Sequence, residues 1–482
     1  MLYMVGRCGA AMNARVQSIQ GVLGSRRGPW LQAVGRVSAG LAAAVAFAAV
    51  GACDSASEPA APKGASSAPL VTEPSTPATT QGAAEPGARP EGDLPQGLLL
   101  AYAQFEVGDG QKVLPKPGPA RLEILTQQGG AWHTEVIEDG DSNVFHKALA
   151  YQAPGGPPGI LTLGGTAAAV KLWRPGPSGF SSTTLWTEMF GGKWDRMRDG
   201  EIGDVYGDGQ PTIVVATHDQ GVVAALHPDA QGHVDVRKLG AKPNTFVHEV
   251  ELGDVDGDGT LEVYATPSEP NKLEGGEQHG LVWRFIPKLG RGPEIAADLG
   301  NRHAKEILVA DVDGDGRDEL YVAVEALTAG SGDSLRLVEP VEIRRYDADT
   351  PPGEGKVVAT LPDRLCRFLT SGDVNGDGQK TLVAAAYRSG VWMLTPPKTA
   401  GGSWDKRNID RRSSGFEHAA VFADLDEDGK DELYVAADEQ GELRRYTFVD
   451  GEPKRETIAK REVPGAMMTW NIMPVPVSIL HP

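Results

Sequence analysis

One stretch of the sequence, Asp311 to Glu319, carries four carboxylates at a spacing suited to a metal ion. Asp311, Asp313 and Asp315 stand two residues apart, so an extended loop can direct all three side chains toward one point. Gly316 then allows the loop to turn sharply, because glycine adopts positive φ without a steric cost. Glu319 follows as a fourth oxygen ligand at the start of a strand-forming run. Ligands that are all oxygens around a tight turn favour a hard cation, and we expect Ca²⁺.

The motif occurs five times. Its copies begin at Asp204, Asp254, Asp311, Asp373 and Asp424, which are 50, 57, 62 and 51 residues apart. A repeat period of this length is typical of solenoids and propellers. An EF-hand loop starts in the same way but requires a glutamate at position twelve and flanking helices. Position twelve is instead an apolar residue of a strand-forming run in every copy, so the EF-hand interpretation fails: Val215, Ala265, Val322, Ala384 and Val435.

The composition favours a turn-rich β protein. The 482 residues include 61 glycines and only 6% aromatic residues. A formal net charge of −19 argues against a nucleic-acid partner, because phosphate binding requires a basic surface. The three cysteines, Cys8, Cys53 and Cys366, are too few for a disulfide framework or a cysteine-rich metal site.

The first 52 residues have the features of a secretory signal peptide. They contain five arginines and no acidic residue, and they end in an alanine-rich apolar run from Val37 to Ala52. That run is shorter than the ~20 residues that a membrane-spanning helix needs, and small residues close it, as in signal peptides. The sequence Val50-Gly51-Ala52-Cys53 resembles the lipobox of bacterial lipoproteins, which implies lipidation of Cys53.

Residues 53–95 are rich in Pro, Ala, Ser, Thr, Glu and Gly and lack apolar periodicity. Such a segment cannot bury enough surface to fold, so we expect a disordered tether that spans roughly 30–40 Å as a coil. Together with a lipid at Cys53, the tether predicts a domain held at the bacterial cell envelope. It would lie outside the cytoplasm, on the periplasmic face or at the cell surface.

From Leu98 onward, short strand-forming runs alternate with glycine-rich turns. Each acidic loop is followed by one run, as in Glu319-Leu-Tyr-Val-Ala, and a second run begins near a glycine further on, as in Gly390-Val-Trp-Met-Leu. A third run has alternating residues, and a fourth leads into the next acidic loop, as in His248 to Gly253. Four strands in about 50 residues are the content of one propeller blade.

Two further units complete a ring of seven. Residues 145–173 fit a blade whose acidic loop is replaced by Pro154-Gly-Gly-Pro-Pro158. Residues 98–137 supply three strands without an inner one, and 468–477 supply one strand without partners. Joining these fragments predicts an all-β fold over 96–482, a seven-bladed β-propeller closed by pairing of the N- and C-terminal strands. Closure of this kind removes the exposed edges of an open array.

The five loops, each close to D-x-[DN]-x-D-G-x-x-[DE], resemble the FG-GAP/VCBS repeat family, which includes the propeller of integrin α subunits. The resemblance covers roughly residues 98–482. It implies calcium ligands at positions one, three, five and nine and at the carbonyl of position seven. Three full sites follow: Asp311, Asp313, Asp315, Arg317 carbonyl and Glu319; Asp254, Asp256, Asp258, Thr260 carbonyl and Glu262; Asp424, Asp426, Asp428, Lys430 carbonyl and Glu432. Two weaker sites bring the total to five: Asp373, Asn375, Asp377, Gln379 carbonyl and Thr381; and Asp204, Asp208 and Thr212, where Tyr206 takes the third position.

A second column stands six positions before each first aspartate, near the start of the leading strand: Arg198, His248, Lys305, Arg367 and His418, with His146 near the matching place in the loop-less blade. If this strand is innermost, the column forms a ring at one mouth of the channel, opposite the calcium loops. Alternation along a strand predicts that positions −6, −4 and −2 share a face. Two long insertions, Pro267–Gln278 and Ala326–Pro340, are expected on the same face.

We therefore expect the ring to bind an anionic ligand such as an acidic sugar or a carboxylate-bearing peptide, because converging cations concentrate anions. In the competing interpretation these side chains only pair with channel acids such as Glu249, Glu251 and Glu306. At the level of function, the first hypothesis is a surface-tethered binding or adhesion module. The alternative is a lyase-like enzyme acting on polysaccharide, with His248 or His418 as general base and Arg198 or Lys305 stabilising the developing enolate.

Overall fold

The computed structural model describes residues 93–192, 195–218, 220–229, 231–269, 278–331, 334–399 and 401–480. All of them belong to one compact unit, 62–482, and the other unit, 1–61, lies outside the described residues. The predicted signal peptide, the predicted lipidation of Cys53 and all of the tether except 93–95 also fall outside these ranges. Within them, no helix has the length and apolar character that crossing a membrane would require.

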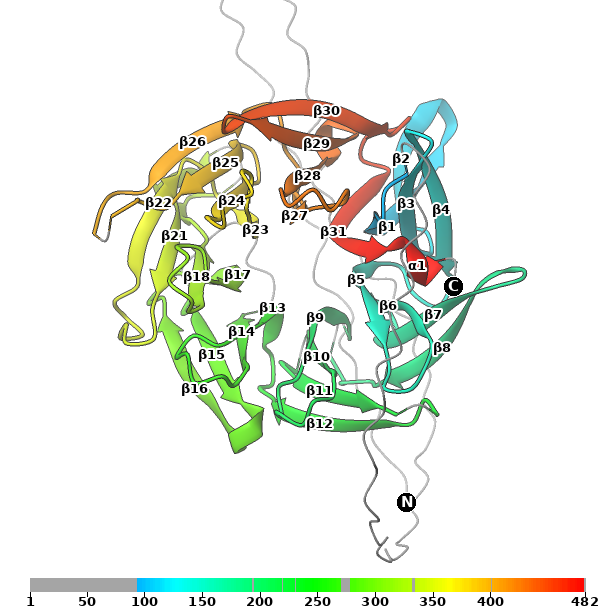
Figure 1. Ribbon diagram of the computed structural model, residues 1–482, viewed down its shortest axis with the longest axis horizontal. Helices are drawn as coiled ribbons and strands as arrows, with labels where there is room; N and C mark the ends of the chain where they lie inside the picture. Colours follow the sequence, from blue (N-terminus) through cyan, green and yellow to red (C-terminus); the bar gives the residue numbers. More distant parts are fainter. Residues whose placement is uncertain are drawn as a thin grey trace, which may run out of the picture. The chain divides into compact units, whose positions relative to one another are not determined.

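The described residues form eight antiparallel sheets, of which seven are arranged as blades around one axis (Figure 1) and the eighth is a two-stranded sheet in an insertion. In six blades the four strands follow one another in sequence order from the axis outward. Blade 1 contains β5 (Phe145–Gln152), β6 (Pro158–Gly164), β7 (Ala169–Gly176) and β8 (Gly179–Thr187). Blade 2 contains β9 (Met197–Gly203), β10 (Thr212–Thr217), β11 (Val223–Pro228) and β12 (Val234–Gly240). Blade 3 contains β13 (Phe246–Gly253), β14 (Glu262–Ser268), β15 (Leu281–Ile286) and β16 (Arg291–Asp298).

The next three blades repeat this order. Blade 4 contains β17 (Ala304–Ala310), β18 (Glu319–Val324), β21 (Val341–Tyr346) and β22 (Lys356–Leu361), and its insertion forms a separate pair, β19 (Leu327–Ala329) and β20 (Arg336–Glu339). Blade 5 contains β23 (Cys366–Gly372), β24 (Thr381–Ala386), β25 (Gly390–Thr395) and β26 (Asp405–Asp410). Blade 6 contains β27 (Ala420–Ala423), β28 (Glu432–Ala437), β29 (Glu442–Val449) and β30 (Glu452–Lys460). Short helical turns are η1 (Asp109–Gln111), η2 (Pro287–Leu289), η4 (Asp438–Gln440) and α1 (Val477–Leu480).

Blade 7 joins the two ends of the chain. Its innermost strand is β31 (Met467–Pro476), which pairs with β1 (Gln96–Gly108) over nine residue pairs from Gln96↔Pro476 to Gln104↔Met467. β3 (Ala120–Gln128) and β4 (Ala131–Asp139) complete it, and β2 (Lys112–Pro117) pairs with the far end of β1. The predicted fold, blade number and terminal closure are confirmed.

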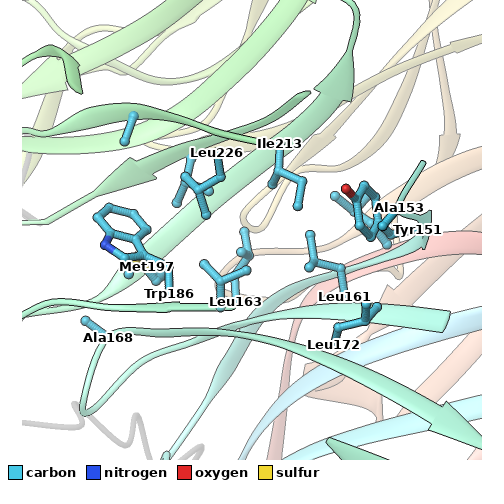
Figure 2. Close-up of a cluster of buried hydrophobic side chains, with 14 of the residues drawn as sticks. Tyr151, Ala153, Leu161, Leu163, Ala168, Leu172, Trp186, Met197, Ile213 and Leu226 are labelled. Carbon is cyan, nitrogen blue, oxygen red and sulfur yellow. The ribbon is translucent and has the colours of Figure 1, made fainter. Parts of the chain in front are cut away.

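The hydrophobic core is divided among the contacts between blades. Among the described residues, seven buried apolar clusters each join two adjacent blades. Figure 2 shows the cluster in which Leu161 and Leu163 of blade 1 meet Ile213 and Leu226 of blade 2. Because neighbours cover both faces of a blade, alternate residues of one strand enter different clusters: Ile213 and Val215 of β10 on one side, Val214 and Ala216 on the other. This two-sided burial explains why the second strands are continuous apolar runs.

Six of the seven innermost strands carry a β-bulge near their start, whereas β27 of blade 6 pairs in a regular register. The pairing register with the second strand shifts at His146, Arg198, Lys305 and Arg367, and at the pair His248–Glu249. In blade 7 the register of β31 shifts at Trp470. The bulged positions coincide with the column of basic and imidazole residues seen in the sequence. Since a bulge re-aims side chains, it changes which residues face the axis.

Candidate functional site: acidic loops and the ring mouth

The five acidic loops share one backbone conformation, including the degenerate copy at Asp204. In each loop, the carboxylate of the first aspartate accepts hydrogen bonds from backbone N–H groups further along the turn, for example from Gly259 to Asp254 at 2.7 Å and from Gly209 to Asp204 at 2.8 Å. The glycine at position six has positive φ in all five copies, between +78° and +89°. Position four also has positive φ throughout, and Glu427 takes this place in the last loop, with φ 61°. The loops are therefore held in shape by the first aspartate before any metal is considered.

Three loops bring their carboxylates together closely enough to hold a cation. Carboxylate oxygens lie within 4.8 Å of one another in three groups: Asp311, Asp313, Asp315 and Glu319; Asp254, Asp256 and Asp258; Asp424, Asp426 and Asp428. An all-oxygen donor set fits a hard metal ion. The residue at position seven carries the predicted carbonyl ligand. Its backbone N–H donates to the aspartate at position five: Thr260 to Asp258, Arg317 to Asp315, Gln379 to Asp377 and Lys430 to Asp428. The loops at Asp373 and Asp204 have the same turns but fewer carboxylates.

Adjacent loops are linked through position eight, which the sequence reasoning missed. The carboxylate of Asp318 accepts a hydrogen bond from the N–H of Asp254 at 2.9 Å. Asp431 accepts one from the N–H of Asp373 at 2.7 Å and donates its own N–H to the Asp373 carbonyl at 2.9 Å. The loops of blades 3 and 4, and of blades 5 and 6, therefore form coupled pairs. The signal that could have revealed them is the Asp-Glu pair at positions eight and nine in two of the copies.

At the opposite ends of the innermost strands, three of the five predicted ring residues take part in one charged network. We call Arg198, Lys305, Arg367, Glu325 and Glu417 the mouth network. Glu417 accepts hydrogen bonds from Arg198 at 3.4 Å and from Arg367 at 3.3 Å, and Arg367 also donates to Glu325 at 3.0 Å. These side chains come from blades 2, 4 and 5 and from the segment leading into blade 6, so the network reaches across the ring. The predicted convergence at one mouth is present, but its acids are not the ones expected from the sequence.

The charges of the mouth network are nearly balanced and buried. Burial and the nearby Arg367 lower the pKa of Lys305 to about 8. Burial opposes ionisation of Glu325, yet Arg367 and Lys305 overcome it and hold the pKa of that carboxyl well below its usual value. The three cations outnumber the two carboxylates by one, so the mouth has a small positive excess at neutral pH.

Beside the network lies a group of imidazoles with unpartnered nitrogens. His146, His218 and His248 are each at least nine-tenths buried, and adjacent ring centroids lie 6.3 Å and 5.0 Å apart. Both nitrogens of His218 and of His248, and Nε2 of His146, have no hydrogen-bond partner. Burial is the main cause that holds the pKa of all three well below the usual value, with Arg198 or Lys305 as the next cause. The three rings are therefore neutral.

His418 differs from the other ring residues. Its Nε2 lies 2.7 Å from the Ser413 hydroxyl, its Nδ1 lies 2.6 Å from the Ala386 carbonyl, and its backbone has a positive φ of 60°. Both ring nitrogens are thus engaged within blades 5 and 6. His418 therefore stabilises the ring, and neither of its imidazole nitrogens is left for a ligand.

The predicted partner acids Glu249, Glu251 and Glu306 lie on the innermost strands of blades 3 and 4, after the column residues His248 and Lys305. Lys147 pairs with Asp199 at 3.0 Å and also contacts Glu201. Glu306 accepts the N–H of Leu369 at 2.6 Å, and Asp199 accepts that of Val250 at 2.9 Å, so each caps a backbone group of the next blade. Burial is the largest cause that raises the pKa of Glu249, Glu251 and Glu306 well above the usual value. Glu306 thus stabilises the neighbouring blade, and the raised pKa of all three acids disfavours the charged form that would neutralise the mouth.

Trp470 and His218 are the ring-mouth residues that the sequence reasoning missed. Trp470 occupies the bulge of blade 7 and is the seventh member of the column; the Arg198 guanidinium lies 5.0 Å from its ring centroid and His146 lies 4.6 Å away. Because Trp470 is not basic, a search for basic residues could not find it, although the repeat predicts a column position in the last strand. His218 directly follows the second strand of blade 2, and its ring stacks on Phe246 with the centroids 4.2 Å apart.

Comparisons with known proteins add little to this description. No protein-family model matches the chain. No curated protein matches it either. Among solved structures, a protein from Lactobacillus plantarum has a TM-score of 0.47 at 10% identity, covering 79% of this chain and 99% of its own. A rhamnogalacturonan lyase from Bacillus licheniformis has a TM-score of 0.30 at 14% identity, covering 74% of this chain and 55% of its own.

Proposed function

We propose that this protein is a calcium-stabilised β-propeller that captures an anionic ligand, an acidic sugar or a carboxylate-bearing peptide, at the ring mouth. The observation that carries the proposal is the convergence of Arg198, Lys305 and Arg367 beside buried imidazoles with unpartnered nitrogens. The chain would be a lipoprotein anchored through Cys53 and displayed outside the cytoplasm, with FG-GAP/VCBS-type repeats in an adhesion role.

The case for calcium is electrostatic. Two carboxylates about 4 Å apart repel by roughly 4 kcal/mol at an effective dielectric of 20, and each full loop gathers at least three. A divalent cation offsets that repulsion. A site filled to a hundred times its dissociation constant adds about 2.7 kcal/mol to the free energy of unfolding. Calcium modules outside cells bind at about 10⁻⁴–10⁻³ M, so such sites are filled there.

The mouth offers three kinds of contact to a ligand. The positive excess of the mouth network attracts a carboxylate. The neutral imidazoles of His218 and His248 can each donate one hydrogen bond and accept another, as hydroxyl-rich molecules require. The indole of Trp470, which is only partly buried, supplies an aromatic face and an unpartnered N–H. Hydroxyls and a carboxylate on one ring are the chemistry of a uronic acid.

The experiment is a glycan and peptide array probed with the full chain, with calcium and with a chelator. We expect capture of uronic acid-containing glycans, with loss of signal in a His218→Ala/His248→Ala variant. The matched control is His233→Ala, an exposed histidine on the turn between β11 and β12, at the face of the acidic loops. Absence of any anionic ligand, or capture that the double variant leaves unchanged, would overturn the proposal.

A lyase-like activity is the second candidate, favoured by the neutral, unpartnered His248 next to Lys305. His248 would remove a proton from the sugar, and Lys305 or Arg198 would stabilise the enolate. The engaged nitrogens of His418 leave it unsuited to the same role. Depolymerisation of a uronic acid polymer with a new ultraviolet-absorbing product, abolished by His248→Ala, would establish this candidate; an unchanged polymer would exclude it.

The lipid anchor has its own test. Metabolic labelling with a fatty acid should mark the wild-type chain and spare a Cys53→Ser variant. Equal labelling of both chains would contradict lipidation of Cys53, and it would have no bearing on the proposed ligand site.

A further inference from the structure

The three full acidic loops share a feature that the two degenerate loops lack. Position nine is glutamate and the residue two further on is tyrosine: Glu262 and Tyr264, Glu319 and Tyr321, Glu432 and Tyr434. In the pairing register, an arginine of the third strand stands opposite each tyrosine: Arg284, Arg345 and Arg445. In the degenerate loops, position nine is Thr212 or Thr381, followed by Val214 or Val383, which stand opposite Ala225 and Met393. The glutamate, tyrosine and arginine therefore occur together or not at all.

Strand geometry places these three side chains on one face of the blade. Residues two apart on a strand point the same way, and directly opposed residues on neighbouring strands are side-chain neighbours. The contacts agree with this geometry: the Tyr321 hydroxyl donates to Glu319 at 2.9 Å, the Tyr434 hydroxyl donates to Glu432 at 3.1 Å, and that of Tyr264 contacts Glu262. The glutamate of each full loop is thus hydrogen-bonded to a tyrosine of the same blade.

In blades 3 and 4 the arginine also reaches the acidic loop. Arg284 donates to the third-position carboxylate of Asp256 at 2.6 Å and contacts Glu262. Arg345 donates to the third-position carboxylate of Asp313 at 2.6 Å and pairs with Glu319 at 3.1 Å. A guanidinium therefore bridges the third and ninth positions in both loops.

Blade 6 provides the internal comparison. Arg445 stands at the equivalent place, but its ion pair is with Glu456 of the outermost strand, at 3.0 Å. The loop aspartates Asp424, Asp426 and Asp428 gather as in blade 3. The ion pair of Arg445 therefore leads away from the loop, and the bridge between the third and ninth positions that Arg284 and Arg345 make is not formed between Asp426 and Glu432.

We propose that Arg284 and Arg345 act as built-in cations of the metal loops in blades 3 and 4. Each guanidinium offsets part of the charge of the third- and ninth-position carboxylates in the metal-free protein, which keeps the loop folded and weakens its affinity for a divalent cation. The blade 6 loop, without such a cation at its aspartates, binds the ion most tightly. This inference rests on the proposed binding of calcium by these loops.

The test is a calorimetric titration of calcium into the chelator-treated full chain. For the wild type we expect one tighter class of site and one weaker class. Arg284→Gln/Arg345→Gln should tighten the weaker class roughly tenfold, because a positive charge near the ion is removed, and should lower the melting temperature in chelator more than in calcium. Arg445→Gln is the matched control and should leave the weaker class unchanged.

Conservative variants separate a charge effect from misfolding. Arg284→Lys/Arg345→Lys keeps the positive charges, so its calcium affinities should stay near those of the wild type. If the glutamine variant does not fold in chelator, its calcium release rate is measured from the loaded protein and should be slower than that of the wild type. Wild-type calcium uptake with unchanged or weaker affinity in the glutamine variant would overturn this inference alone. No calcium uptake by any variant would overturn the proposed role of calcium as well.

Discussion

Glu417 is the residue on which the charge balance of the ring mouth depends. Its side chain is 1% exposed and its two oxygens are shared between Arg198 and Arg367. Glu417→Gln keeps the shape and removes the charge, so two buried guanidinium groups lose their common counter-ion. Breaking a buried ion pair by removing one partner costs about 3–5 kcal/mol. We expect the lower end, about 3 kcal/mol of unfolding free energy, because Arg367 keeps Glu325.

The same substitution has an opposite effect on anion binding. The positive excess at the mouth rises from one charge to two, so an added anion should bind more tightly and recover part of the lost stability. The assay is chemical unfolding in excess calcium at increasing sulfate concentration, with chloride as the reference salt. Glu439→Gln is the control, since Glu439 is an exposed residue whose pair with Arg388 is 3.9 Å long and should contribute little. A loss below about 1 kcal/mol, or identical sulfate dependence in wild type and variant, would refute the reasoning.

Three further predictions concern the closure and the loops. Burial raises the pKa of Asp438 to about 7 while Thr469 of the closing strand donates two hydrogen bonds to it. Since the folded pKa exceeds the unfolded one, stability should fall as pH rises from about 4 to about 7, and Asp438→Asn should remove that part of the slope in denaturant titrations; parallel pH profiles would contradict it. Glu427→Gly should raise the unfolding free energy by about 1 kcal/mol by relieving its positive φ, and a loss would show that its side-chain contacts dominate. Ile472→Ala in the closing strand should cost about 3 kcal/mol in thermal unfolding, whereas a cost equal to that of the partly buried Ile479→Ala would contradict a role in closure.

The ring could be predicted from the sequence because its information is local and repeated. The first aspartate and the position-six glycine of each loop specify a turn without reference to the rest of the chain. The fully apolar second strands, such as 213–216, require cover on both faces, which neighbouring blades provide. Closure followed by counting strands, since three strands at one end and one at the other leave no alternative that pairs every edge.

The partners of the mouth residues could not be predicted in this way. Glu325 follows the second strand of blade 4 and Glu417 precedes β27, so neither lies on a strand or at a repeated position. Their distance along the sequence from Arg198 gives no local signal: 219 residues separate Arg198 from Glu417. Only the closed ring brings them together. The same holds for Arg284 and Asp256, whose contact depends on the register between the loop and the third strand.

The expected alternation of −6, −4 and −2 fails for a physical reason that bears on function. Val250, Ile307 and Leu369, at position −4, enter the apolar clusters between blades, while the acids Asp199, Glu249 and Glu306 occupy position −5. In blades 2, 3 and 4 the bulge near the strand start breaks the two-residue period, so that the residue at −6 (Arg198, His248 or Lys305) and the acid at −5 both face the axis. A regular strand would bury one of each such pair between blades, where a charge without a partner costs several kcal/mol. The bulges therefore let these three blades carry polar residues at the mouth while keeping the apolar contacts that hold the ring together.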